Sequence, residues 1–213
     1  MIPIANDAPL QLRVRHGVAD IPAAEWDALV GGDDQPFVRH AFLAALEQSG
    51  SLQRALGWSA MPLLLYRGEQ LVGAAPGYLK GNSHGEFVFD WSWADAYRRH
   101  GLAYYPKLLV GVPYSPITGP RLLVGGGNDA GARRRQLAGA IEEMVSELRL
   151  SSAHLNFLTD ADAAAVAHDP WLPRFDWQFH FDNPGYADFE ALLAEFSHKK
   201  RKNIRQERRQ AQA

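Results

Sequence analysis

Residues 108–158 read LLVGVPYSPITGPRLLVGGGNDAGARRRQLAGAIEEMVSELRLSSAHLNFL. Apolar runs at 108–113 and 121–124 predict buried strands, and a Gly-rich turn then leads into a helical pattern over about 130–150. The run at 153–158 predicts the next strand. A strand, a long helix and another strand in this order predict one crossover within a single sheet. The stretch therefore predicts an α/β fold.

The rest of the chain continues this alternation of short strands and helices. Its order predicts a mixed central sheet with helices on both faces. The expected elements are a strand near 11–15, a helix opened by Pro22 that buries Trp26, Leu29 and Val30, a helix at 39–48, a hairpin over 61–80 that turns at 67–70, a helix at 160–168, a strand at 175–181 and a helix at 186–196.

Length and composition exclude several classes of protein. The 213 residues suffice for one large domain, or for one domain and the start of another, and 46% are hydrophobic, as in folded proteins. There is no cysteine, which excludes disulfides, a thiolate nucleophile and cysteine zinc sites, and favours a reducing compartment. The sequence has no apparent leader and no run of about 18 apolar residues, so we expect a cytoplasmic protein without a membrane span.

Charge is distributed unevenly along the chain. The net charge is -2, yet the stretch from His198 onward is strongly basic and contains only Glu207 as an acidic residue. This stretch looks helical. It contacts RNA phosphate, or it is a solvated helix, or it docks on another domain. Its basic residues are Lys199, Lys200, Arg201, Lys202, Arg205, Arg208 and Arg209.

Ionisable groups and aromatic residues gather at residues 81–123. If 84–91 is extended, His84, Glu86 and Asp90 share one face and the aromatic side chains share the other. The polar face is either an ordinary solvated strand face or a cluster that accepts a proton from an attacking amine or holds a cationic group. Asp90 and Glu86 are therefore the catalytic candidates. Their spacing matches no established set of metal ligands, so we expect no metal.

Aromatic residues interleaved with charged ones follow this segment. They are either part of the core or the lining of a cleft that grips a ligand through flat apolar rings and polar tips. The substrate-binding candidates are His84, Trp91, Trp93, Asp95, Tyr97, Tyr104, Tyr105 and Lys107.

A glycine-rich turn precedes the long helix. The free N–H groups at a helix N-terminus bind phosphate, including the pyrophosphate of an acyl-CoA. The alternative is an ordinary loop, with Asp129 as a cap or dipole partner of the helix that follows. The cofactor-binding candidates are Gly125, Gly126, Gly127 and Asn128.

Two strings resemble a known family. They are GEFVFDWSWADAYRRHGLAYYPKLLVGVPYSPITGPRLL within residues 81–123 and SHKKRKNIRQERR at 197–209. They resemble N-acyltransferases labelled peptidoglycan biosynthesis or recognition proteins, which are related to the Fem-type aminoacyl transferases. The resemblance implies a GNAT-like fold used twice in tandem, with residues 1–196 as the first lobe and 197–213 as a basic helix at the entry to a second lobe.

The same resemblance implies a function. It implies transfer of an acyl or aminoacyl group to an amine, with a peptidoglycan precursor as one acceptor. The donor is an acyl-CoA or an aminoacyl-tRNA, and the latter would meet Lys199–Arg209. The usual acyl-CoA loop of GNAT enzymes has the pattern (Gln or Arg)-x-x-Gly-x-(Gly or Ala). The corresponding stretch of this chain, RLLVGGGNDAGA, differs from that pattern. We expect Asp90 to act as base or ammonium partner in direct attack by a neutral amine. The alternative is a non-catalytic recognition domain that binds a cell-wall precursor or a protein partner.

Overall fold

The computed structural model describes residues 8–32 and 34–212, so residues 1–7, on which the expectation about a leader partly rests, lie outside it. The chain divides into two compact units, Met1–Leu172 and Pro173–Ala213. The strands are β1 (Leu10–Val14), β2 (Trp58–Ala60), β3 (Leu63–Arg67), β4 (Gln70–Ala75), β5 (Gly77–Lys80), β6 (Lys107–Val110) and β7 (Ala153–Leu155). The helices are α1 (Ala23–Val30), α2 (His40–Gln48), α3 (Trp91–Arg99), α4 (Ala130–Glu147), α5 (Asp160–Ala165), α6 (Phe189–Ala194) and α7 (His198–Ala211).

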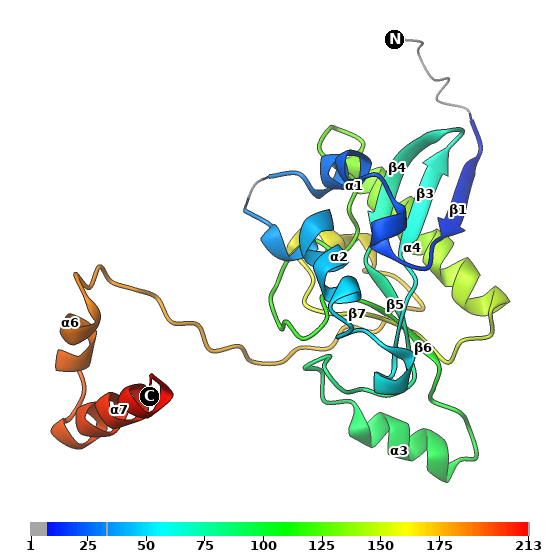
Figure 1. The fold of residues 1–213 in the computed structure, drawn as a ribbon. Coiled ribbons are helices and arrows are strands. Elements are labelled where there is room, and N and C mark those ends of the chain that lie inside the picture. Colours follow the sequence, from blue (N-terminus) through cyan, green and yellow to red (C-terminus); the bar gives the residue numbers. More distant parts are fainter. Residues whose placement is uncertain (1–7, 33, 213) are drawn as a thin grey trace. The chain divides into compact units, whose positions relative to one another are not determined.

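The strands of the first unit form two sheets (Figure 1). The first has the order β1-β3-β4 and is antiparallel, and the second has the order β2-β5-β6-β7. The hairpin expected over 61–80 is present as β3 and β4, but its second half divides at Pro76, where β4 ends and β5 begins. Proline has no amide hydrogen to donate to a ladder, so the chain changes sheet at this residue.

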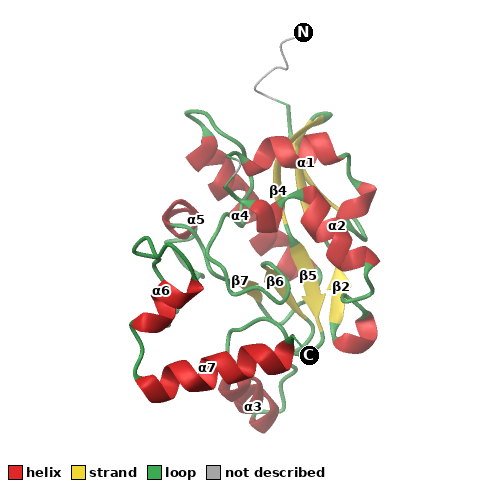
Figure 2. Ribbon diagram, turned by 60° about the vertical axis from the view of Figure 1, so that its left-hand side comes forward, coloured by secondary structure: helices red, strands yellow, loops and turns green. Residues whose placement is uncertain are grey.

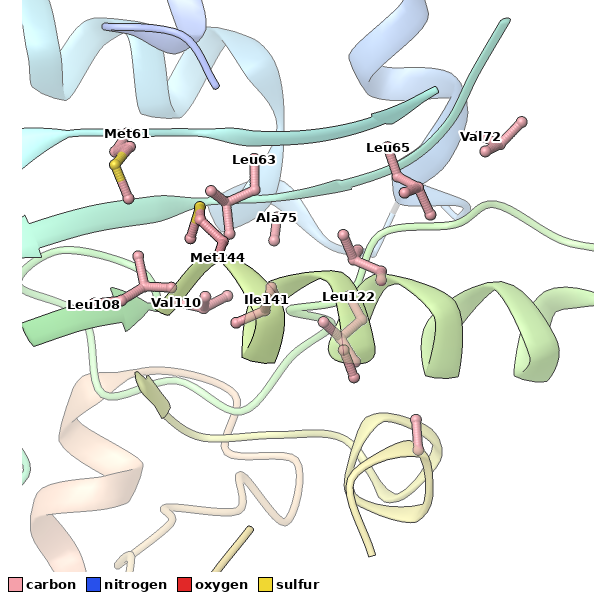
Figure 3. Close-up of a cluster of buried hydrophobic side chains, with 13 residues drawn as sticks. Met61, Leu63, Leu65, Val72, Ala75, Leu108, Val110, Leu122, Ile141 and Met144 are labelled. Carbon is pink, nitrogen blue, oxygen red and sulfur yellow. The ribbon is translucent and has the colours of Figure 1, made fainter. Parts of the chain in front are cut away.

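Helices cover both faces of the first sheet, as the sequence predicts (Figure 2). Because side chains alternate along a strand, β3 sends Leu63 and Leu65 to one face and Leu64 to the other. Leu63 and Leu65 share a core with Ile141 and Met144 of α4, as Figure 3 shows. The second core packs Leu64 against buried residues of α1 and α2, Trp26, Leu29, Val30 and Leu43 among them. The second sheet is the mixed one, because β6 and β7 are parallel whereas its other strand pairs are antiparallel, and the α/β class with a mixed sheet is thus confirmed.

The expected crossover joins β6 and β7 through α4. These two strands are parallel, and Leu109 of β6 lies opposite His154 of β7. Helix α4 buries Leu137, Ala138, Ile141 and Met144 at the spacing of one helical face. This arrangement accounts for the helical pattern at 130–150, and it leaves the face of the second sheet that carries Leu109 and His154 for other contacts. Before α4, the strand expected at 121–124 is reduced to a single bridge between Leu123 and Ala74.

The prediction of an extended segment at 84–91 is wrong. This segment is a loop that leads into α3, because Gly85 and Phe87 adopt φ angles of 77° and 56°, which a strand does not permit. The expected burial is also reversed. Glu86 and Asp90 are buried, whereas Phe89 is 68% exposed. The alternation of polar and aromatic residues at 84–91 therefore belongs to a loop whose carboxylates, Glu86 and Asp90, point into the protein interior.

The strand predicted at 175–181 is not formed either. No strand occurs among the described residues of the second unit, 173–212, so this segment has no neighbour with which to form a ladder. Its aromatic residues are exposed, with Phe179 at 99%. Period-two alternation specifies an extended backbone, but a strand also requires a partner.

The second unit contains the helices α6 and α7. Ser197 caps α7 by accepting a hydrogen bond from the amide of Lys200, which confirms the expected helix at the basic stretch. Helix α7 contacts α6 through an ion pair between Arg205 and Glu190 and through the Arg208 guanidinium, 4.4 Å from the centre of the Phe189 ring. The division into 1–196 and 197–213 stays a prediction.

Replacing Ile141 with alanine tests the core between α4 and the sheet. Ile141 is fully buried, so its truncation should lower the free energy of unfolding by about 2–5 kcal/mol. Urea denaturation followed by circular dichroism measures this change. Leu148→Ala is the matched control, because Leu148 is 52% exposed and should lose much less. Equal losses in the two variants would contradict the core described above.

Candidate functional site

Two lysines lie opposite each other in the second sheet. Lys80 ends β5 and Lys107 begins β6, and the antiparallel register pairs them directly. Both side chains are fully buried. Like charges in directly opposed positions destabilise a sheet, and buried charges are costly unless they are paired. The two lysines therefore require acidic partners.

The loop between β5 and α3 supplies these partners. Lys107 Nζ lies 2.9 Å from Glu86 Oε2 and 2.5 Å from Asp90 Oδ2, and it also donates to Ser83 Oγ at 3.1 Å. Glu86 Oε1 lies 4.0 Å from Lys80 Nζ, so this carboxylate lies between both lysines. Two ammonium groups and two carboxylates thus form a buried cluster with balanced formal charge, which we call the lysine–carboxylate cluster.

Lys80 has two further contacts. Its ammonium donates to the carbonyl oxygen of His84 and lies 3.3 Å from the centre of the Trp58 ring, a cation–π arrangement. Burial lowers the pKa of Lys80 to about 8, although the neighbouring Glu86 carboxylate opposes this shift. Lys80 is therefore much closer to losing its proton at neutral pH than an ordinary lysine.

The two carboxyl groups shift in opposite directions. Burial raises the pKa of Glu86 and outweighs the lysines that favour its charged form. Burial also acts to raise the pKa of Asp90, but hydrogen bonds with Lys107, Ser83 and Tyr104 together hold it below its usual value. Asp90 is therefore a stable carboxylate. One oxygen of each group, Glu86 Oε1 and Asp90 Oδ1, is buried with no hydrogen-bond partner among the described residues.

Two tyrosines connect this cluster to the surface. Tyr104 donates its hydroxyl hydrogen to Asp90 Oδ2 at 2.6 Å, and the Tyr105 hydroxyl lies 2.8 Å from Ser83 Oγ. Both tyrosines line a surface depression of about 370 Å³. The remaining residues that line it are Trp91, Ala94, Asp95, Arg98 and Leu102. Aromatic rings over polar groups therefore form an open pocket directly above the buried charges.

A second depression of about 440 Å³ lies along α3, lined by Ser92, Trp93, Ala96, Tyr97, His100 and Leu102. In an ideal helix its residues lie on the side of α3 opposite to Trp91, Ala94 and Arg98. Leu102, which is 61% exposed, lines both depressions. Tyr97 lines the second depression and Tyr104 the first, and their rings are in contact, 5.0 Å apart at an interplanar angle of 73°. Helix α3 itself contributes no buried residue.

The structure brings together most of the residues that the sequence singled out. Trp91, Asp95, Tyr104 and Tyr105 share one depression, and Trp93 and Tyr97 share the other. Lys107, Glu86 and Asp90 lie beneath the first depression rather than in its lining. His84 is exposed, and its ring lies 5.1 Å from that of Trp91 at an interplanar angle of 58° instead of joining the carboxylates.

Sequence reasoning missed Lys80, Ser83 and His154. His154 Nε2 lies 3.0 Å from Ser152 Oγ and 3.4 Å from the Tyr104 hydroxyl, and its Nδ1 lies 4.0 Å from Asp90 Oδ2. A polar residue inside the apolar run 153–158 was the available signal, because a buried strand seldom carries a histidine without a partner. Lys80 gave a similar signal at the end of a predicted strand.

The glycine-rich turn at Gly125–Asn128 is not among the residues lining either depression. The amide of Gly125 donates to the Leu29 carbonyl oxygen at 2.8 Å, and Arg133 donates to the Gly126 carbonyl oxygen at 2.6 Å and pairs with Asp129. These contacts fold the turn onto α1 and the first turn of α4. Its role as a phosphate site stays a prediction.

Residues 8–32 and 34–212 contain no group of three or more His, Asp or Glu side chains placed to hold a metal ion. Within the same residues, no helix has the length and apolar character needed to cross a membrane.

Comparison with known proteins places the chain in a family. A family model described as FemAB-like, peptidoglycan biosynthesis/recognition, matches residues 17–213. The chain belongs to the FemAB-like family. This membership confirms the resemblance found at residues 81–123 and 197–209, and it supports an acyl- or aminoacyl-transferase kind of function.

The curated proteins and the solved structures give no further assignment for this FemAB-like chain. None of the curated proteins compared with the chain matches it. Among solved structures, a ribosomal-protein-alanine N-acetyltransferase from Brucella melitensis biovar Abortus 2308 is similar, with a TM-score of 0.42 and 14% sequence identity. The match covers 82% of this FemAB-like chain and 99% of that chain.

Replacing Lys107 with methionine tests the lysine–carboxylate cluster. The variant leaves Asp90 without its ammonium partner, and removal of one member of a buried ion pair should cost about 3–5 kcal/mol of unfolding free energy. Chemical denaturation measures this loss. Arg99→Met is the control, because it removes one partner of an exposed pair with Asp95 and should cost at most about 1 kcal/mol. Similar losses would show that the cluster is open to water.

The pH dependence of stability tests the state of Lys80. Burial lowers the pKa of Lys80 in the folded chain to about 8, whereas in the unfolded chain the pKa has its ordinary value of 10.5. Between these values the unfolded state binds more protons, so the Lys80 contribution to stability should rise with pH. Subtracting the unfolding free energy of Lys80→Met from that of the wild type, from pH 7 to 10, isolates this contribution. A flat difference would contradict the lowered pKa.

Proposed function

We propose that this chain transfers an acyl or aminoacyl group to an amine-bearing acceptor, with a peptidoglycan precursor as the acceptor class. The observation that carries this proposal is the depression over Tyr104 and Tyr105, whose hydroxyls are hydrogen-bonded to Asp90 and Ser83 of a buried charged cluster. Membership of the FemAB-like family supplies the reaction class.

The proposed acceptor site has features that suit an amine. Asp95 lines the depression, and its carboxylate is paired with Arg98 and lies 3.1 Å from Arg99 Nε. Trp91 and the two tyrosines supply ring faces that attract a cation. An acceptor bound here would lie against Tyr104, within one hydrogen bond of the Asp90 carboxylate.

The chemistry that this proposal requires is direct attack. The acceptor amine must be neutral when it meets the acyl carbon, so the site has to orient it and remove a proton. No covalent enzyme intermediate is needed. Both carboxyl groups are buried, and Asp90 already accepts hydrogen bonds from Lys107 and Tyr104. We therefore propose that Asp90 and Glu86 act by positioning the side chains hydrogen-bonded to them, and not by direct contact with the acceptor.

The donor and its binding residues are further parts of the proposal. Acyl-CoA is one donor, with the turn at Gly125–Asn128 next to the start of α4 as the proposed phosphate site. An aminoacyl-tRNA is the other, with α7 as the proposed contact. Lys200, Arg205 and Arg208 already contact the α6 segment, which leaves Lys199, Arg201, Lys202 and Arg209 as the proposed phosphate ligands.

A second candidate function is recognition without catalysis. In this case the chain binds a cell-wall precursor or a protein partner through the same aromatic depression. The observation that favours it is the complete burial of Asp90, Glu86 and Lys107, which is what a structural ion cluster would show. Binding of a precursor without any transfer, in a chain supplied with both donors, would support this alternative.

Thermal stabilisation by ligands tests the proposal. A ligand that binds only the folded state raises the melting temperature, so acetyl-CoA, desulfo-CoA and a peptidoglycan precursor with a free amine should be compared. We expect the precursor to stabilise the chain and Trp91→Ala to abolish that stabilisation. Trp91 is exposed, so the variant should retain the melting temperature of the unliganded protein.

The outcomes separate the roles. A shift with both CoA compounds would make this chain the donor site, and a shift with the precursor alone would make it the acceptor site. Leu172→Ala is the control, because Leu172 is 75% exposed and lines neither depression. A precursor response equal in the wild type and Trp91→Ala would contradict the assigned depression.

A further inference from the structure

We propose that the depression lined by Tyr104 and Tyr105 selects acceptors that carry a carboxylate beside their amine, and that Arg98 recognises this carboxylate. The inference rests on the proposed function for the amine, but it narrows the acceptor class and can be tested by binding alone. Sequence reasoning did not single out Arg98. In the structure it lines this depression of about 370 Å³ together with Asp95, and these two are the charged residues of the lining.

Helix α3 brings the recognising groups to one side of the depression. Side chains three or four residues apart lie on the same side of an α-helix, and Trp91, Asp95 and Arg98 have this spacing. Ala94 lies three residues after the ring and four before the guanidinium. All four line the depression, and the short side chain of Ala94 leaves it open between its larger neighbours.

The two charged side chains of the depression pair with each other. Arg98 forms an ion pair with Asp95, and Arg99 Nε lies 3.1 Å from the second oxygen of the same carboxylate, Oδ2. Arg99 is not among the residues that line the depression. The hydrogen bond from Arg98 is the main cause that holds the pKa of Asp95 below its usual value. Asp95 is therefore a permanent carboxylate with two guanidinium partners, one of which lines the depression.

This arrangement favours a ligand with charges of both signs. An ammonium group that binds to Asp95 competes with Arg98, and Arg99 still balances the carboxylate. Arg98 is then released, and a carboxylate on the same ligand gives it a new partner. An amine without a carboxylate lacks this second ion pair, so it gains less from the exchange. The side chain of Arg98 is 78% exposed, so water partly replaces the missing partner and the preference should be about tenfold, not absolute.

The spacing of Asp95 and Arg98 defines the ligand further. Because the two side chains are in direct contact, the ammonium and the carboxylate that they bind must also lie close together. An α-amino acid centre, with both groups on one carbon, meets this requirement. The planar guanidinium matches a carboxylate through two parallel hydrogen bonds, and the face of the exposed Trp91 ring attracts the ammonium group. The inferred acceptor is therefore an amine on an α-amino acid centre whose carboxylate is free.

Two peptides that differ by one carboxylate test this selection. Each is a tripeptide blocked at both ends, with diaminopimelic acid in the middle of one and lysine in the middle of the other, so the free amine has a neighbouring carboxylate only in the first. Calorimetric titration at low salt measures both dissociation constants, because salt screens exposed charges. We expect the wild type to bind the diaminopimelate peptide about tenfold more tightly. Equal Kd values, or no binding of the diaminopimelate peptide, would overturn the proposal.

Substitutions of Arg98 show whether it makes the contact. Arg98→Gln should weaken binding of the diaminopimelate peptide about tenfold without weakening that of the lysine peptide, whereas Arg98→Lys keeps the charge but loses the fork and should retain part of the preference. Arg135→Gln is the matched control, because it removes one positive charge from an exposed position of α4 that lines neither depression. An equal loss of preference in Arg135→Gln and Arg98→Gln would point to net charge alone and overturn the proposal.

Two alanines of α3 show which depression holds the ligand. Ala94 lines the proposed depression, and Ala96 lines the other one, of about 440 Å³. Leucine favours a helix nearly as well as alanine does, so Ala94→Leu should fill its depression without disturbing α3. We expect Ala94→Leu to weaken the binding of both peptides by about tenfold or more and Ala96→Leu to leave both Kd values unchanged. The reverse result would place the ligand in the other depression and overturn the proposal.

Transfer assays distinguish a failure of this inference from a failure of the proposed function. With acetyl-CoA or an aminoacyl-tRNA as donor, equal kcat/KM values for both peptides, unchanged in Arg98→Gln, would overturn the inference and leave the proposed function standing. If neither peptide is modified while the preference in binding and its loss in Arg98→Gln hold, the proposed function fails and Arg98 remains the carboxylate-binding residue.

Discussion

The opposed pair of buried lysines is the constraint on which this site depends. Lys80 and Lys107 are neighbours in the register of β5 and β6, and neither reaches water. Their charges would destabilise the sheet if they stood alone. The chain resolves this by folding the loop after β5 back over the strands, so that Glu86 and Asp90 lie against the ammonium groups. The position of this loop then determines where α3 begins, since Asp90 immediately precedes Trp91.

The second sheet consequently has two faces of different character. One face carries Leu108 and Val110, which pack into the core with α4 (Figure 3). The other carries Lys80, Lys107 and His154, with Tyr104 above them. Hydrophobic burial holds the first face, whereas the second depends on hydrogen bonds and ion pairs. The apolar face provides the rigidity with which the polar face can hold reacting groups in place.

The sequence predicted the framework better than the site. Periodicity located α1, α2, α4 and the crossover between β6 and β7, because apolar spacing reflects burial directly. It failed at 84–91, where the same alternation belongs to a loop with Gly85 and Phe87 at positive φ. It failed again at 175–181, because no neighbouring strand occurs among the described residues 173–212 of the second unit. Residue type and local spacing cannot reveal either backbone torsion or a missing partner.

The candidate site, like the fold, could be predicted only in part. The choice of Asp90, Glu86, Tyr104 and Tyr105 required only that ionisable and aromatic residues crowd one stretch. The roles of Lys80 and His154 depended on register between strands that are distant in sequence, so one-dimensional reasoning could not assign them.

The lack of buried residues in α3 has a consequence for access to this site. A helix that contributes no side chain to the core can unfold locally at a small fraction of the global unfolding free energy, while α4 and the strands stay folded. Amide hydrogens of α3 should therefore exchange with solvent far sooner than those of α4. Such transient opening would admit water and small molecules to the lysine–carboxylate cluster without any loss of the hydrophobic core.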